Sequence, residues 1–158
     1  MLNKINDKKE RAILVGAAAG KTSMRVAKEH LAELERLADT AEAETVERVI
    51  QRMPKYNSST LIGPGKLEEI RQLCDINKAS VVIFDDDLTG SQTKNIEAVL
   101  KEVKVIDRSQ LILDIFALHA RTAESRIMVE IAQMEYTMPR LTNMWTHLCR
   151  QVGGIGTR

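Results

Sequence analysis

The stretch that decides the fold is "ASVVIFDDDLTGSQTKNIEAVLKEVKVIDR", which runs from Ala79 to Arg108. It opens with four β-favouring residues in a row, continues with a helical segment that Thr89 or Ser91 can cap, and closes with the apolar run "VKVIDR". A strand, a helix and a second strand in this order form the βαβ unit of a parallel sheet. The stretch therefore predicts an α/β fold.

The sequence before this stretch repeats the same alternation. "RAILVGA" (11–17) predicts a buried strand, "RVAKEHLAELERLADTA" (25–41) a helix, and "AETVERVIQRM" (43–53) a second strand. "PKYNSSTLIGPGK" (54–66) reads as a loop, and helical spacing returns between 67 and 76. We predict a small parallel four-stranded sheet flanked by helices, formed by residues 1–107.

Beyond Asp107 the pattern changes to two helical segments, "SQLILDIFALHA" and "AESRIMVEIAQMEYTM", joined by a short polar link. Such a pair should pack as an antiparallel helical hairpin, which we assign to residues 108–150. The second helix carries an apolar stripe of Ile127, Ile131, Met134, Met138 and Leu141, and Pro139 is expected to kink or end it. Residues 151–158 form the start of a glycine-rich linker, with Gly153, Gly154, Gly156 and Arg158.

The composition of the 158 residues is that of a soluble protein, with 44% apolar residues and a net charge of +1. The sequence has neither a signal peptide nor an apolar run long enough for a membrane span, so we expect a cytoplasmic protein. Cys74 and Cys149 lack motif partners and are predicted to be core thiols. The three histidines, His30, His119 and His147, lie too far apart in the sequence to suggest a metal site.

The stretch "ILVGAAAGKTSM" (13–24) resembles a phosphate-binding loop, but its spacing is wrong. A Walker A loop needs four residues between its glycines, whereas only three alanines separate Gly16 from Gly20. We therefore predict a small-residue loop that follows the first strand, and no nucleotide site.

The sequence Asp85-Asp86-Asp87-Leu88-Thr89 matches the D-x-D-x-T pattern of haloacid-dehalogenase phosphatases. In that chemistry Asp85 would attack phosphorus and Asp87 would transfer the proton, with magnesium balancing the charge. That family places the motif on the first strand of its sheet and needs further catalytic groups on later strands. A small phosphoryl-transfer enzyme is therefore only the alternative to an acidic strand end that stabilises a helix N-terminus.

Two other clusters are candidate binding sites. Gly63, Gly65 and Lys66 precede a helix and could form an anion-binding loop, or a tight turn that Pro64 makes rigid. The hairpin tip carries candidate RNA contacts: His119, Arg121, Thr122, Ser125 and Arg126. Arginine suits phosphate and base contacts, and all six basic residues from Arg108 to Arg158 are arginines. The alternative for the tip is a solvated turn with helix-capping residues.

Several motifs together resemble the N-terminal domain of the HflX family of ribosome-associated GTPases. They are "LADTAEAETV", "TLIGPGKLEEI", "KVIDRSQLILDIFA", "ARTAESRIMVEIAQMEY" and "GGIGTR", in this order from Leu37 to Arg158. The resemblance implies a domain that binds the large ribosomal subunit and its rRNA and is not an enzyme by itself. It also implies that GTP and magnesium are bound by a G domain after the linker, in a protein that splits or rescues ribosomes. Val152 and the tip sequence "TAES" depart from the family's usual residues.

Overall fold

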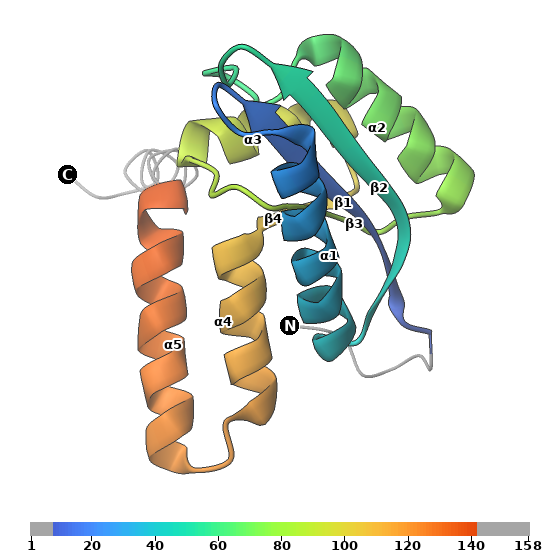
Figure 1. Cartoon of the computed structure of the whole chain (residues 1–158). Helices are drawn as coiled ribbons and strands as arrows, with labels where there is room; N and C mark the ends of the chain where they lie inside the picture. Colours follow the sequence, from blue (N-terminus) through green and yellow to red (C-terminus); the bar gives the residue numbers. More distant parts are fainter. Residues whose placement is uncertain (1–7, 142–158) are drawn as a thin grey trace, which may run out of the picture.

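The computed structural model describes residues 8–141 of the chain (Figure 1). The elements, in chain order, are β1 (Glu10–Ala19), α1 (Met24–Thr40), β2 (Ala43–Met53), α2 (Pro64–Asn77), β3 (Val81–Phe84), α3 (Gly90–Leu100), β4 (Lys104–Asp107), α4 (Arg108–His119), α5 (Ala123–Thr137) and the 3-10 turn η1 (Met138–Leu141). The predicted α/β class is confirmed, and each of the four predicted strands is present.

The four strands form one fully parallel sheet in the order β2-β1-β3-β4. Strands β1 and β2 pair over their whole length, whereas β3 and β4 have four residues each. Because the strands are parallel, their carboxyl ends meet at one edge. The chain leaves β1 first towards β2 and then crosses to β3, which makes the gap between β1 and β3 the topological switch point of this edge.

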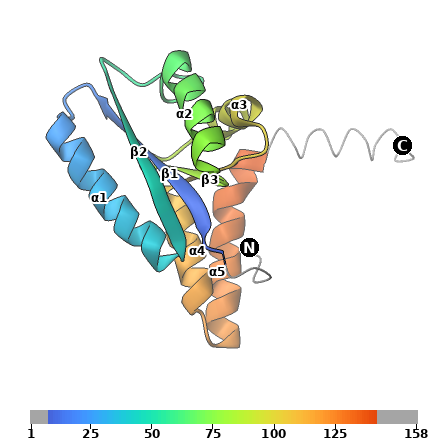
Figure 2. The ribbon, with the colours of Figure 1, turned by 90° about the vertical axis from the view of Figure 1, so that its right-hand side faces the viewer.

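Helices cover both faces of the sheet, with α1 on one side and α2 and α3 on the other (Figure 2). Alternate residues of β1 serve the two faces: Leu14 packs with Leu31 and Leu34 of α1, whereas Ile13 packs with Ile70 on the α2 side. Both sets of side chains are buried, which explains why the sequences of the central strands β1 and β3 are almost continuously apolar.

The predicted small-residue loop after the first strand is wrong, because β1 continues to Ala19. A Cβ atom on Gly16 would lie 3.2 Å from Cγ of Leu31, so the small residue lets α1 pack directly on the strand. The chain turns only at Gly20, where φ is +59°. The predicted loop 54–66 is also too long, since α2 begins at Pro64, a residue that favours the first turn of a helix.

Helices α4 and α5 lie side by side, run in opposite directions and extend beyond the sheet (Figure 1). Leu111 in the second turn of α4 is 2% exposed and belongs to the core on the α1 face. The first turns of α4 are therefore part of the sheet's core. Helix α5 ends at Thr137 and continues as η1, as expected from Pro139. None of the helices in residues 8–141 is long and apolar enough to cross a membrane.

Candidate functional site

The three acids that follow β3 have three different partners. Asp85 accepts a hydrogen bond from Nη1 of Arg108 at 2.8 Å, and its other oxygen lies 3.6 Å from Nδ1 of His30. Asp87 accepts a hydrogen bond from the Ser109 hydroxyl at 2.7 Å. The carboxylate that would have to attack phosphorus is thus held by a guanidinium, an arrangement that fits a structural role.

The threonine of the D-x-D-x-T pattern also has a structural role. The hydroxyl of Thr89 accepts a hydrogen bond from the Gln92 backbone N–H, and the Gln92 side chain accepts one from the Thr89 N–H. These two bonds form a capping box at the start of α3, which confirms Thr89 as its cap. Within residues 8–141 no group of three or more Asp, Glu, His or Cys side chains is arranged to hold a metal ion.

A cavity of about 140 Å³ lies at the topological switch point. It is lined by Gly16, Ala17, Thr22, Ala27, His30, Tyr56, Asp85 and Asp86. The Tyr56 hydroxyl donates to Asp86 at 2.9 Å; burial and this carboxylate raise the pKa of Tyr56 to about 12. Burial also raises the pKa of Asp86. Pockets for drug-sized ligands typically measure about 300 Å³ or more, so this cavity is too small for a nucleotide.

Asp107 at the end of β4 joins the sheet to the hairpin, a role that the sequence analysis missed. Its side chain is 3% exposed and accepts hydrogen bonds from the backbone N–H groups of Leu88 and Gln110, at 2.9 and 3.0 Å. The Tyr136 hydroxyl of α5 donates to the same carboxylate in a short hydrogen bond. Only the position of Asp107, at the end of a short strand and before a helix, could have indicated its role as a cap.

The end of α5 is fixed to the sheet unit by further contacts. The guanidinium of Arg140 lies 3.5 Å from the centre of the Tyr136 ring, and its Nη2 is 3.9 Å from Asp107. A Cβ atom on Gly90 would lie 2.9 Å from Cα of Arg140, so the backbones of α3 and η1 touch here. The hairpin is therefore attached at its base, and its tip is the end farthest from these contacts (Figure 1).

The predicted RNA-contact residues lie together at this tip, and most of their polar groups form hydrogen bonds within the tip itself. Thr122 caps α5, and its hydroxyl exchanges hydrogen bonds with the backbone and side chain of Ser125. Nδ1 of His119 lies 2.8 Å from the Ile115 carbonyl, and Nε of Arg126 lies 3.5 Å from the Ala120 carbonyl. Arg121 is exposed and has no ion-pair partner in the described part of the chain. Arg121 and Arg126 are therefore the tip cations that remain accessible.

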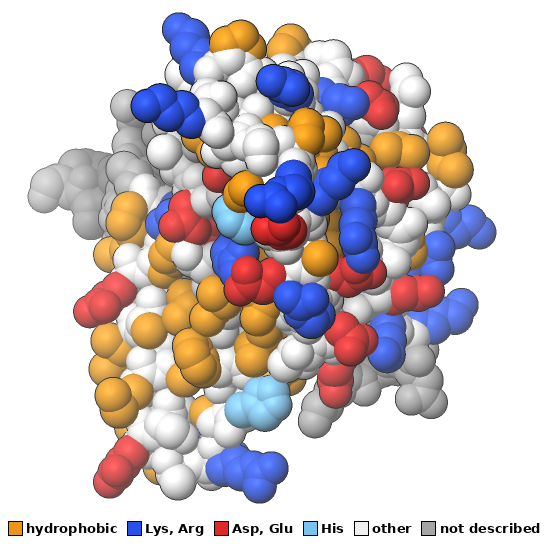
Figure 3. Space-filling model, in the orientation of Figure 1, with side chains coloured by type: hydrophobic (Ala, Val, Ile, Leu, Met, Phe, Trp, Pro, Cys, Tyr) orange, Lys and Arg blue, Asp and Glu red, His pale blue; other side chains and the backbone are white. Residues whose placement is uncertain are grey.

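The apolar stripe predicted on the second hairpin helix faces solvent. Four of its members are half exposed or more: Ile127 (55%), Ile131 (50%), Met134 (63%) and Met138 (64%). The partly buried side of α5 carries Val129, Ala132 and Tyr136 instead. In Figure 3, hydrophobic side chains accordingly gather over the hairpin. The fifth member, Leu141, has a side chain outside the described part.

The loop predicted to bind an anion has few free groups. Gly63 is the N-cap of α2, and its N–H donates to Oε1 of Gln51 at 2.8 Å. Lys66 forms an ion pair with Glu69 at 2.9 Å. A Cβ atom on Gly65 would meet nothing within 4 Å, so no close approach requires a glycine there. The geometry is that of a helix start closed by Pro64.

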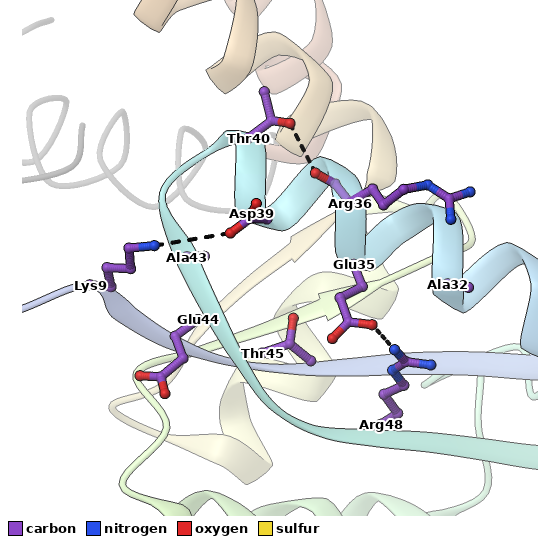
Figure 4. Close-up of a pocket in the computed structure, with 10 residues that line it drawn as sticks. All are labelled: Lys9, Ala32, Glu35, Arg36, Asp39, Thr40, Ala43, Glu44, Thr45 and Arg48. Atoms are coloured by element: carbon purple, nitrogen blue, oxygen red, sulfur yellow. Dashed lines mark hydrogen bonds and ion pairs between the residues drawn. The ribbon is translucent and has the colours of Figure 1, made fainter.

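A hollow of about 620 Å³ is an open groove between α1 and the edge strand β2 (Figure 4). Two ion pairs form among its charged residues: Arg48 with Glu35, and Lys9 with Asp39 at 4.0 Å. Thr40 donates to the Arg36 carbonyl at 2.9 Å. Such a groove of opposite charges fits a solvated surface better than a catalytic site.

The predicted core thiol Cys74 is buried in α2, and burial raises its pKa to about 11. Seven other residues named in the sequence analysis lie outside the described residues: His147, Cys149, Val152 and the linker residues Gly153, Gly154, Gly156 and Arg158.

Comparisons with known proteins match almost the whole chain. Residues 28–117 match the family model "GTP-binding GTPase N-terminal", and residues 119–158 match "GTP-binding GTPase Middle Region". The boundary between the two falls near the hairpin tip, so α4 belongs to the first model and α5 to the second.

Curated relatives carry the name "GTPase HflX". The protein from Flavobacterium psychrophilum is 48% identical over 158 residues, which is 100% of this chain and 38% of the relative. The protein from Escherichia coli K12 is 43% identical over 130 residues, or 82% of this chain and 30% of the relative. The chain thus spans less than two fifths of the length of these relatives.

A solved structure has the same fold. It is a GTP-binding protein from the hyperthermophilic archaeon Sulfolobus solfataricus in complex with GDP, with a TM-score of 0.66 and 28% identity. The match covers 87% of this chain and 40% of that one. The family models, the relatives and this fold agree with the resemblance seen in the sequence. The chain belongs to the HflX family of GTP-binding proteins, of which it represents the N-terminal domain.

Proposed function

We propose that this chain is the part of an HflX-like GTPase that docks on the large ribosomal subunit in the cytoplasm. The proposal rests on one observation: a hairpin that is fixed at its base and presents Arg121 and Arg126 at its free tip. Guanidinium groups in such a place suit rRNA phosphates, because charge-assisted hydrogen bonds are the strong ones. In the whole protein, the G domain binds GTP and magnesium, and its GTP hydrolysis drives ribosome splitting or rescue.

The test is the double variant Arg121→Ala/Arg126→Ala in a pelleting assay with purified large subunits at several salt concentrations. Loss of two phosphate contacts should weaken binding and reduce the slope of log K against log salt by about 2. The fold should survive, because the tip buries little. A matched control is Lys94→Ala/Lys104→Ala, which removes two exposed charges elsewhere.

Equal pelleting of wild type and the tip variant would exclude the tip as the contact. Thr122→Ala is a less specific probe, because it also removes a helix cap worth about 1 kcal/mol. Circular dichroism of each variant shows whether the helices remain formed.

A further inference from the structure

A group of exposed cations lies at the carboxyl edge of the sheet, far from the hairpin tip. We call it the basic edge; its members are Lys21, Arg25, Lys28, Arg52 and Lys55, all with exposed side chains. In Figure 3, Lys and Arg side chains gather in the upper part of the molecule, where the first half of α1 and the end of β2 lie. The whole chain has a net charge of only +1, so this concentration is local.

Strand pairing brings Lys21 and Lys55 close together. Ala19 is the register partner of Met53, at the ends of β1 and β2. The N–H of Gly20 lies 3.3 Å from the Met53 carbonyl and 3.0 Å from that of Pro54. The turn that carries Lys21 therefore contacts the turn that carries Lys55.

Arg52 joins the same surface from the α1 side of the sheet. Arg48 pairs with Glu35 of α1, and Arg52 points to the same side of β2 because side chains alternate along a strand. Four strand residues advance by about 13 Å, which corresponds to about nine residues of helix. Helix α1 runs antiparallel to β2, so Arg52 lies beside the first turns of α1, where Arg25 and Lys28 are located.

Most of these charges have no counterion. Arg25 lies 3.8 Å from Glu29, whereas no carboxylate in residues 8–141 forms an ion pair with Lys21, Lys28, Arg52 or Lys55. The neighbouring acids already have hydrogen-bond partners: Asp85 binds Arg108, and Asp86 binds Tyr56. The other end of the groove between α1 and β2 differs, because its cations Arg48 and Lys9 form ion pairs with Glu35 and Asp39. What distinguishes the basic edge is that its unpaired cations lie close together, and a concentration of like charge of this kind attracts an external anion.

We propose that the basic edge binds the phosphate backbone of RNA and forms a second contact in the docking proposed above. The choice of RNA as the ligand rests on that proposed function. The aromatic ring of Tyr56 supports RNA over an acidic protein. Tyr56 is adjacent to Lys55 in the sequence and 42% exposed, and its hydroxyl is anchored on Asp86. A fixed, exposed ring beside cations is the combination on which unpaired bases stack. The basic edge and the tip lie at opposite ends of the molecule (Figure 1), so one RNA surface would be held at two separate points.

The test compares Lys28→Ala/Arg52→Ala with the matched control Lys94→Ala/Lys104→Ala, which also removes two exposed charges that form no ion pair within residues 8–141. Binding of the whole chain is measured with purified large subunits and with poly(U) RNA at several salt concentrations. We expect the slope of log K against log salt to fall by about 1.4 with poly(U) in the first variant, at 0.7 for each lost contact to a single strand. The control should keep the wild-type slope.

The outcomes separate this proposal from the docking function. Equal poly(U) slopes for both variants would overturn the basic edge, whatever happens with ribosomes. If the wild type does not bind large subunits but its poly(U) slope falls as expected in the variant, docking is refuted and the RNA surface stands. Polyglutamate serves as the protein-like probe. If wild type binds polyglutamate as tightly as poly(U), with the same loss in the variant, the surface is a general anion site and its assignment to RNA is wrong.

Discussion

Asp107 is the residue at which the sheet and the hairpin meet. Burying a carboxylate is costly unless hydrogen bonds replace its water. Here the donors come from Leu88 before α3, from Gln110 in α4 and from Tyr136 in α5. One side chain thus orients three elements. Only the bond from Gln110 is local to the strand end, whereas the bonds from Leu88 and Tyr136 cross 19 and 29 residues of sequence.

Replacing Tyr136 with Phe should test this link. The change removes one donor from a buried carboxylate while keeping the ring under Arg140, so we expect the free energy of unfolding to fall by about 1–3 kcal/mol in a urea titration. The matched control is Tyr56→Phe, which also removes a hydroxyl that donates to an aspartate. Tyr56 is 42% exposed, so water can replace its bond and the loss should be smaller. Equal losses would show that burial of Asp107 does not determine the effect.

The same tyrosine makes a prediction about alkaline pH. Burial and the hydrogen bond to Asp107 raise the pKa of Tyr136 in the folded chain above the ordinary value of about 10. Because the unfolded chain then loses the proton first, this contribution to stability is complete below pH 10 and decreases as the pH rises further. Tyr136→Phe should therefore lose stability less steeply than wild type above pH 10. Some slope should remain, since the pKa of Tyr56 is also raised, to about 12. Parallel curves for both proteins would contradict the proposed cause.

At the scale of elements, α4 and α5 both carry many apolar residues, but these residues pack differently. Leu111 of α4 is buried among Leu34, Val81 and Ile83, whereas the stripe of α5 that includes Ile131 faces solvent. Periodicity in a sequence shows that a helix has an apolar face, but it does not show what covers that face. For this reason the sequence predicted the helices, but it did not predict which side of α5 is covered.

Alanine substitutions should separate the two apolar groups. Leu111→Ala leaves a cavity in a packed core and should lower the free energy of unfolding by about 2–5 kcal/mol. Ile131→Ala removes a half-exposed side chain and should change it by about 0.5 kcal/mol or less. Urea unfolding followed by circular dichroism measures both. A loss of several kcal/mol for Ile131→Ala would mean that α5 is covered within the folded chain.

At the scale of the whole molecule, the alternation of strand and helix patterns predicted the parallel class, and burial on both faces accounts for the apolar runs of β1 and β3. The sequence did not determine that β3 lies beside β1, since nothing local distinguishes the possible neighbours. The candidate site shows the same division. The tip residues are contiguous, so their clustering could be predicted, whereas the basic edge combines residues from β2, α1 and two turns that only the strand register brings together.

The packing of Leu111 has a consequence for where the chain can be divided. A fragment that ends at Asp107 lacks Leu111, and it also leaves the Asp107 carboxylate without the donors from Gln110 and Tyr136. A fragment that ends at Ala120 keeps Leu111 and Gln110 and loses the contacts of α5 and η1. We therefore expect the longer fragment to unfold cooperatively in urea at a reduced midpoint, and the shorter one to show a broad transition with weak amide-exchange protection in β3. If the shorter fragment unfolds as sharply and at the same midpoint as the longer one, the core of the sheet does not depend on α4.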